Sequence, residues 1–230
     1  MTTTYYELTN IQNKIRDFED NSIDMIYTDP PFGTTNASWD KSLAWGSLFK
    51  DMWRVLKPNG IIILYCAMPF TYDLLKYDKP KYHYTWIKNN RTGFFHAKKQ
   101  PLRNTEEILV YYKKQPTYNP QMEGDKVFKK SIRKLKDKQN YYGRRENIEK
   151  SYISDTESHT GYYPTTAKYW NIRKDGSGIT RTDEQIDYFI KTYSNENDTI
   201  LDMTCCNKYV GNRCITLKRN YIGVDIRKID

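Results

Sequence analysis

The chain has 230 residues, a formal net charge of +9 and 38% hydrophobic residues. This length suits one α/β domain with an insertion and is short for two independent domains, so we predict a single domain over residues 1–230. No apolar run approaches the ~20 residues of a membrane-spanning helix, and the polar start MTTTYYELTN does not fit a signal peptide, so we expect a cytoplasmic protein without a membrane partner.

The order of apolar runs predicts an α/β protein. Strands are expected at 5–8, 23–28, 60–66, 84–88, 108–112, 199–203 and 221–224, and helices at 42–56, 182–193 and 209–218. Trp39, Trp45 and Trp53 flank or lie in the first helix and are expected to pack it on the sheet. The four cysteines form no CxxC pair and the three histidines show no metal-ligand spacing, so no disulfide and no metal site is predicted.

The most informative motif follows the strand at 23–28 and consists of Asp29, Pro30, Pro31 and Phe32. Two prolines cannot donate to a strand ladder, so the strand ends at Asp29, and loops at such strand ends hold the ligand in open α/β sheets. The amino nitrogen of a nucleobase is a poor nucleophile because its lone pair is delocalised into the ring. The Asp29 carboxylate and the Pro30 carbonyl can accept the two amino hydrogens and free that lone pair, while Phe32 stacks on an extruded base. The motif therefore indicates methyl transfer to an exocyclic amine; the alternative is a simple turn after a strand.

The flanking sequence resembles a known family. The segment NSIDMIYTDPPFGTTNASWD (21–40) is similar to the catalytic segment of DNA amino-methyltransferases that use S-adenosylmethionine, and an aspartate in the first motif position is the adenine-N6 form. The segments LKPNGIIILY (56–65), AKKQPLRNTEEILVYYKKQPTYNPQM (97–122) and NYIGVDI (220–226) resemble later parts of the same family, the second of them its phage-type members. Because the catalytic motif precedes the cofactor loop, the resemblance implies a beta-class enzyme with a circularly permuted Rossmann-like sheet, S-adenosylmethionine as cofactor and a base flipped from double-stranded DNA as substrate.

The resemblance also implies which residues hold the cofactor. The cofactor loop corresponds to Asp202, Thr204, Cys205, Cys206 and Asn207, and the ribose-binding carboxylate to Asp225. This loop departs from the family pattern Asp-x-x-x-Gly-x-Gly, because the first glycine is delayed to Gly211. Small side chains, and an Asn able to adopt a left-handed conformation, keep a working loop possible. A second departure replaces the family's His-Pro-Thr-x-Lys-Pro motif with SGITRT, where Thr180 and Arg181 are expected to supply a hydroxyl and a cation.

The basic charge is concentrated in one segment. Residues 81–150 contain 18 Lys or Arg and 7 Asp or Glu, a net of +11, whereas the remaining chain carries −2. In beta-class members the target-recognition insertion separates the catalytic and cofactor halves, so we expect it at about residues 115–180, with phosphate contacts from the basic segment. The alternative is a solvated loop. The predicted DNA contacts are Arg91, Lys98, Lys99, Lys129, Lys130, Arg133, Lys134, Lys136, Arg144 and Arg145.

These observations predict a DNA adenine-N6 methyltransferase, and two alternatives stay open. The altered cofactor loop allows a catalytically silent relative that binds DNA or a partner subunit. An RNA adenine-N6 methyltransferase is the second alternative, because related motifs occur in RNA enzymes. A homodimer, a methyltransferase-like partner subunit and a cognate restriction endonuclease are the protein partners to consider, in a bacterial or virus-infected cell.

Overall fold

The protein is described by a computed structural model that covers residues 1–129, 131–134, 153–156, 158–173 and 181–229, without the side chains of 131–134 and 153–156. The chain divides into two compact units. The first unit comprises Met1–Asn119 with Thr165–Asp230, and the second comprises Pro120–Pro164. The second unit falls within the range 115–180 expected for the insertion.

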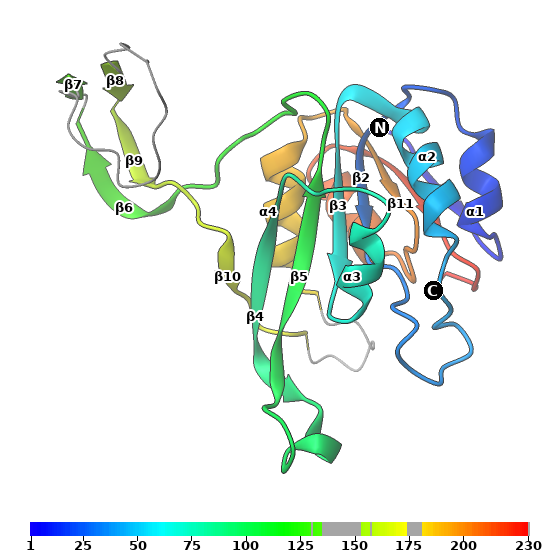
Figure 1. Ribbon diagram of the computed structural model, residues 1–230. Coiled ribbons are helices and arrows are strands. Elements are labelled where there is room, and N and C mark those ends of the chain that lie inside the picture. Colours follow the sequence, from blue (N-terminus) through cyan, green and yellow to red (C-terminus); the bar gives the residue numbers. More distant parts are fainter. Residues whose placement is uncertain (130, 135–152, 157, 174–180, 230) are drawn as a thin grey trace, which may run out of the picture. The chain divides into compact units, whose positions relative to one another are not determined.

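The first unit is built on an eight-stranded sheet with the order β1-β12-β11-β2-β3-β5-β4-β10 (Figure 1). β5 runs antiparallel to both of its neighbours, and the other pairs are parallel. The strands are β1 (Thr3–Tyr6), β2 (Ile23–Thr28), β3 (Leu56–Cys66), β4 (Tyr82–Thr92), β5 (Arg103–Tyr111), β10 (Ala167–Tyr169), β11 (Thr199–Asp202) and β12 (Asn220–Val224). The predicted mixed α/β fold with the last strands beside the first is confirmed.

Helices cover both faces of this sheet. Ile26 and Ile62 pack in one core with residues of α1 (Ile11–Lys14), α2 (Trp45–Val55) and α3 (Phe70–Leu75). Met25 and Ile63, which point to the opposite face, pack in a second core with residues of α4 (Asp183–Tyr193) and α5 (Tyr209–Thr216). This alternation explains why residues 25–27 of β2 and 61–66 of β3 are apolar without a polar face.

The expected elements are present, with differences at their ends. β1 begins two residues earlier than predicted, and β3 already begins at Leu56, so the turn-like KPNG is part of the strand. β4 and β5 are longer than the apolar pattern suggests, because they continue as a hairpin with polar residues that pair Thr92 with Arg103. Trp45 is buried in the core as expected, but Trp39 is 47% exposed and does not pack α2 on the sheet.

The second unit contains two antiparallel pairs. β6 (Glu123–Phe128) pairs with β9 (His159–Tyr162), and β7 (Ser131–Lys134) pairs with β8 (Ile153–Thr156). The Phe128 and His159 rings stack with centroids 4.9 Å apart. Across the described parts of both units, no helix is long and apolar enough to cross a membrane.

The pairing of β2 with β11 places the functional loops. From β2 the chain continues to β3 on one side, whereas β11 continues to β12 on the other. The two strands are parallel, with Asp202 beside Tyr27, so the loops after them emerge together at one edge. Such a reversal of strand order opens a crevice at the carboxyl ends of the strands.

Candidate active site at the switch point of the sheet

A cavity of about 690 Å³ lies at the carboxyl ends of β2 and β11. Its wall includes the Asp29–Phe32 motif, the Asp202–Asn207 loop and Asp225. The hydroxyl oxygens of Thr28 and Thr204 lie 3.0 Å apart and link the two loops directly. The structure thus brings together the predicted catalytic and cofactor motifs, which are distant in the sequence.

The Asp29 carboxylate is held by a buried cation. Arg181 donates to Asp29 Oδ1 over 2.7 Å and to Glu106 Oε2 over 3.1 Å. Lys88 donates to the other Glu106 oxygen over 2.6 Å. Burial raises the pKa of Asp29 to about 6, and the Arg181 charge opposes that rise. Arg181 was expected beside the cofactor; it lines the same cavity and contacts Asp29, the carboxylate predicted to be catalytic.

Two aromatic rings support the Arg181 guanidinium. Its central carbon lies 4.7 Å from the Tyr65 ring centroid and 4.9 Å from that of Trp86. Tyr27 in turn donates its hydroxyl to Tyr65 over 3.0 Å. These contacts restrict the positions open to the Arg181 side chain, and through it those open to the Asp29 carboxylate.

The loop after Asp29 is ordered by a second carboxylate. Asp40 accepts backbone hydrogen bonds from Gly33, Thr34 and Thr35 over 2.7, 3.0 and 2.6 Å. Burial acts to raise the pKa of Asp40, but hydrogen bonds from Thr35, Gly33 and Thr34 lower it below its ordinary value. The loop is therefore closed on itself around an ionised carboxylate.

Phe32 lies partly exposed on the cavity wall. Its ring stacks on Phe70 with centroids 5.2 Å apart and an interplanar angle of 20°. Pro30 is buried beside it, and Pro31 also contributes to the wall. The aromatic ring predicted to stack on a base is thus held in a fixed orientation.

The cofactor loop begins at a buried carboxylate. Asp202 accepts the Thr204 backbone N–H over 3.2 Å and the Tyr221 hydroxyl over 3.1 Å. Burial raises the pKa of Asp202 to about 7, and these hydrogen bonds oppose the rise. Asp202 therefore changes charge near neutral pH.

The loop turns without glycine. Cys206 adopts the left-handed region at φ 55°, the conformation expected of the following Asn207. Asn207 instead accepts the Tyr209 N–H over 3.0 Å at the start of α5. Gly211 packs this helix: a Cβ there would lie 2.1 Å from the Tyr5 hydroxyl and 2.9 Å from the Tyr221 ring. The delayed glycine thus permits helix packing rather than close approach of a ligand.

Asp225 is buried, and its carboxylate already accepts hydrogen bonds from other residues of the chain. Its carboxylate accepts the backbone N–H of Cys206 over 2.8 Å, and Arg227 donates to it from both its backbone N–H, over 2.8 Å, and its side chain, over 3.0 Å. Trp39 lies near this pair, with its ring 5.7 Å from the Arg227 guanidinium. A ribose at Asp225 would have to share the carboxylate with Arg227.

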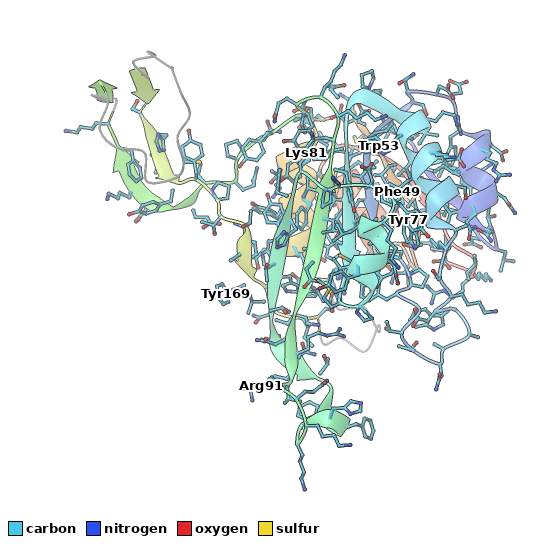
Figure 2. The ribbon with its side chains drawn as sticks, viewed as in Figure 1. Phe49, Trp53, Tyr77, Lys81, Arg91 and Tyr169 are labelled. Atoms are coloured by element: carbon cyan, nitrogen blue, oxygen red, sulfur yellow. The ribbon has the colours of Figure 1, made fainter. Side chains whose placement is uncertain are left out.

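The predicted DNA contacts lie in three places. Arg91, Lys98 and Lys99 are exposed on the hairpin formed by β4 and β5, and Figure 2 labels Arg91 on it. Lys129 is exposed in the second unit. Arg133 and Lys134 belong to β7, whose side chains are not described. The other predicted DNA contacts lie outside the described residues: Lys130, Lys136, Arg144 and Arg145. Thr180, which was predicted beside the cofactor, also lies outside them.

Four further residues of the site were not predicted from the sequence: Tyr65, Lys88, Glu106 and Asp40. Asp40 ends the segment that resembles the family, so its position offered a signal. Glu106 and Lys88 offered none, because charged residues in a hairpin are ordinarily exposed. Among the described residues, no group of three or more His, Cys, Asp and Glu side chains could hold a metal ion.

Comparison with known proteins identifies the family. The chain is 26% identical to the type II methyltransferase M.HpaI of Haemophilus parainfluenzae over 232 residues, which cover 96% of this chain and 69% of that protein. Among solved structures, it is similar to M1.HpyAVI in complex with SAM (TM-score 0.61, 18% identity, 99% of this chain and 94% of that chain). It is also similar to the cytosine-N4-specific PvuII DNA methyltransferase (TM-score 0.66, 12% identity, 99% and 83%). The sequence model of the N6 and N4 DNA methylases matches residues 23–229, nearly the whole chain, and the protein therefore belongs to this DNA methylase family.

Proposed function

We propose that this DNA methylase transfers a methyl group from S-adenosylmethionine to N6 of an adenine flipped out of double-stranded DNA. The observation that carries the proposal is the shared cavity, in which Asp29 after β2 and the Asp202–Asn207 loop after β11 meet at the Thr28–Thr204 contact. Asp29 favours adenine over cytosine, because the family's adenine-N6 members carry an aspartate at this position. The order of the two motifs along the chain supports the beta class.

The cavity fits the proposed cofactor. S-adenosylmethionine supplies an electrophilic methyl group and carries a sulfonium and an ammonium charge, which the Asp202 carboxylate attracts when ionised. The Asp225 carboxylate, which follows β12 on the cavity wall, accepts the ribose hydroxyls and shares its oxygens with Arg227. The small Cys205 and Cys206 side chains, with the left-handed turn at Cys206, leave room for the backbone to approach a ligand despite the missing glycine.

The residues of the chain activate the amine of the base. Arg181 occupies Oδ1 of Asp29, so Oδ2 can accept one amino hydrogen while the Pro30 carbonyl accepts the other. These two bonds favour a tetrahedral nitrogen with an available lone pair. Phe32, held by Phe70, stacks on the base. We further propose that the second unit is the target-recognition insertion and that Lys129 contacts phosphate there.

A catalytically silent DNA-binding subunit is the second candidate. Arginine side chains engage both functional carboxylates, Asp29 through Arg181 and Asp225 through Arg227. A ribose would have to compete with Arg227 for Asp225, whereas Arg181 contacts Oδ1 of Asp29 and the base would use Oδ2. Binding of S-adenosylmethionine therefore distinguishes the silent subunit from the active enzyme.

The first prediction concerns the proposed acceptor. We expect Asp29→Ala to reduce methylation of plasmid DNA by at least ~100-fold, because losing one such bond in the transition state costs on the order of 3 kcal/mol. Asp73→Ala on α3, which removes an exposed carboxylate paired with Lys76, serves as the control and should methylate normally. Wild-type turnover by Asp29→Ala would contradict the assignment.

The second prediction follows from the raised pKa of Asp29. Only the ionised carboxylate offers both oxygens as acceptors, so kcat/KM for DNA, measured at saturating S-adenosylmethionine, should rise with pH through about 6, the pKa of Asp29. The Arg181 charge lowers this pKa, so Arg181→Gln should move the midpoint of the profile to higher pH. An unchanged midpoint in Arg181→Gln would show that another group controls the profile.

The third prediction tests cofactor binding. S-adenosylmethionine at ~100 times its dissociation constant should stabilise the protein by roughly 2.7 kcal/mol and raise its melting temperature. Asp225→Ala should remove most of that shift, whereas Arg227→Ala should retain it, because it frees the same carboxylate. If millimolar cofactor gives neither a thermal shift nor a calorimetric signal, with or without DNA, the silent subunit is the better description.

A further inference from the structure

The hairpin formed by β4 and β5 projects from the catalytic edge of the sheet. The last residue of β3, Cys66, pairs with Glu107 of β5, whereas β4 and β5 continue until Thr92 pairs with Arg103. β3 runs parallel to β2, so its end lies at the edge where Asp29 follows β2. Figure 1 shows the hairpin extending beyond the other strands in this direction.

The tip of this hairpin presents two phenylalanines to solvent. Phe94 is 66% exposed and Phe95 102%, the highest value among the large hydrophobic side chains that the structure describes. Both lie in the 3-10 turn Phe94–His96, which follows Gly93 at φ 92°. A turn of this kind holds the rings outward on a paired hairpin, and exposed apolar side chains grouped in this way mark an interaction site.

The surroundings of the rings are cationic. Residues 89–105 contain Arg91, Lys98, Lys99 and Arg103, all exposed, and no aspartate or glutamate. Arg103 donates to the Met68 carbonyl over 3.1 Å, which ties the base of the projection to the loop after β3. A DNA duplex offers partners for both kinds of side chain. Its phosphates attract the cations, and its stacked bases can contact the apolar rings between them. The position at the catalytic edge of a DNA methylase favours DNA over an acidic protein or a lipid surface.

We propose that the hairpin tip is a wedge that enters the DNA duplex, with Phe94 and Phe95 filling the space that the flipped base leaves. The proposal rests on the base flipping included in the proposed function. Extruding a base breaks its stacking and pairing, and an apolar ring inserted at the gap restores stacking for the neighbouring bases. Arg91, Lys98, Lys99 and Arg103 hold the phosphates on either side of that gap.

The wedge is tested by binding to a labelled short duplex with and without a single abasic gap. A protein that fills a gap binds the gapped duplex more tightly, and we expect a preference of about 10-fold for the wild type. Both duplexes contain only G·C pairs, so that the intact one offers no adenine to flip. Phe94→Ala combined with Phe95→Ala should then remove the preference and leave binding to the intact duplex close to normal. Phe95→Trp should keep the preference, because an indole also stacks.

Tyr77→Ala is the matched control, because Tyr77 is a 51% exposed aromatic residue that lies apart from the hairpin, between α3 and β4 (Figure 2). It should retain the wild-type preference. A wild type without a preference, or a double variant that keeps it, overturns the wedge. A double variant weakened equally on both duplexes also overturns it, since the tip would then only contact DNA. Wild-type methylation of plasmid DNA is measured alongside, so that failure of the proposed function is seen separately.

Discussion

The parallel pairing of β11 with β2 is the contact on which the candidate site depends. It joins two segments whose loops are 176 positions apart at the Thr28–Thr204 contact. Each strand is apolar on both faces because helices cover both sides of the sheet, so the pairing is stabilised by two cores at once. The chemistry of the site is thus positioned by buried strands, and the loops supply only its reactive groups.

Electrostatic balance is the second constraint. Arg181 and Lys88 face Glu106 and Asp29 in a largely buried row, two cations with two carboxylates. A buried charge is tolerated when partners and hydrogen bonds compensate its lost hydration, and deletion of one member leaves another uncompensated. The row extends from β4 and β5 to Asp29, the carboxylate proposed to be catalytic, because Glu106 binds both Lys88 and Arg181 and Arg181 in turn binds Asp29.

Local patterns allowed much of this arrangement to be predicted. Three signals are each contained within a few residues: the motif at Asp29, the strand at 199–203 and the acidic strand end at Asp225. The structure places all three at one cavity. Contacts between distant segments could not be predicted in this way. Arg181 reaches Asp29 only because α4 packs across the sheet, and Trp39 lines the cavity instead of supporting α2.

Two local features of the backbone also could not be predicted from the sequence. Cys206 rather than Asn207 adopts the left-handed turn, because the Asn207 side chain accepts the Tyr209 N–H and Cys206 donates its own N–H to Asp225. The length of the hairpin was missed because its outer half is polar and lacks the alternation of a half-buried strand. In both cases hydrogen bonds of the backbone determine the local conformation, whereas the pattern of apolar and polar side chains does not indicate it.

Identification of the modified nucleoside is the sharpest test of adenine methylation by this protein. Plasmid DNA from a host without its own methylases, treated with the protein and S-adenosylmethionine, is digested to nucleosides and analysed by mass spectrometry. We expect N6-methyldeoxyadenosine that depends on the added protein. N4-methyldeoxycytidine as the product would contradict the adenine assignment, and the absence of any methylated nucleoside, with cofactor bound, would contradict the proposed reaction.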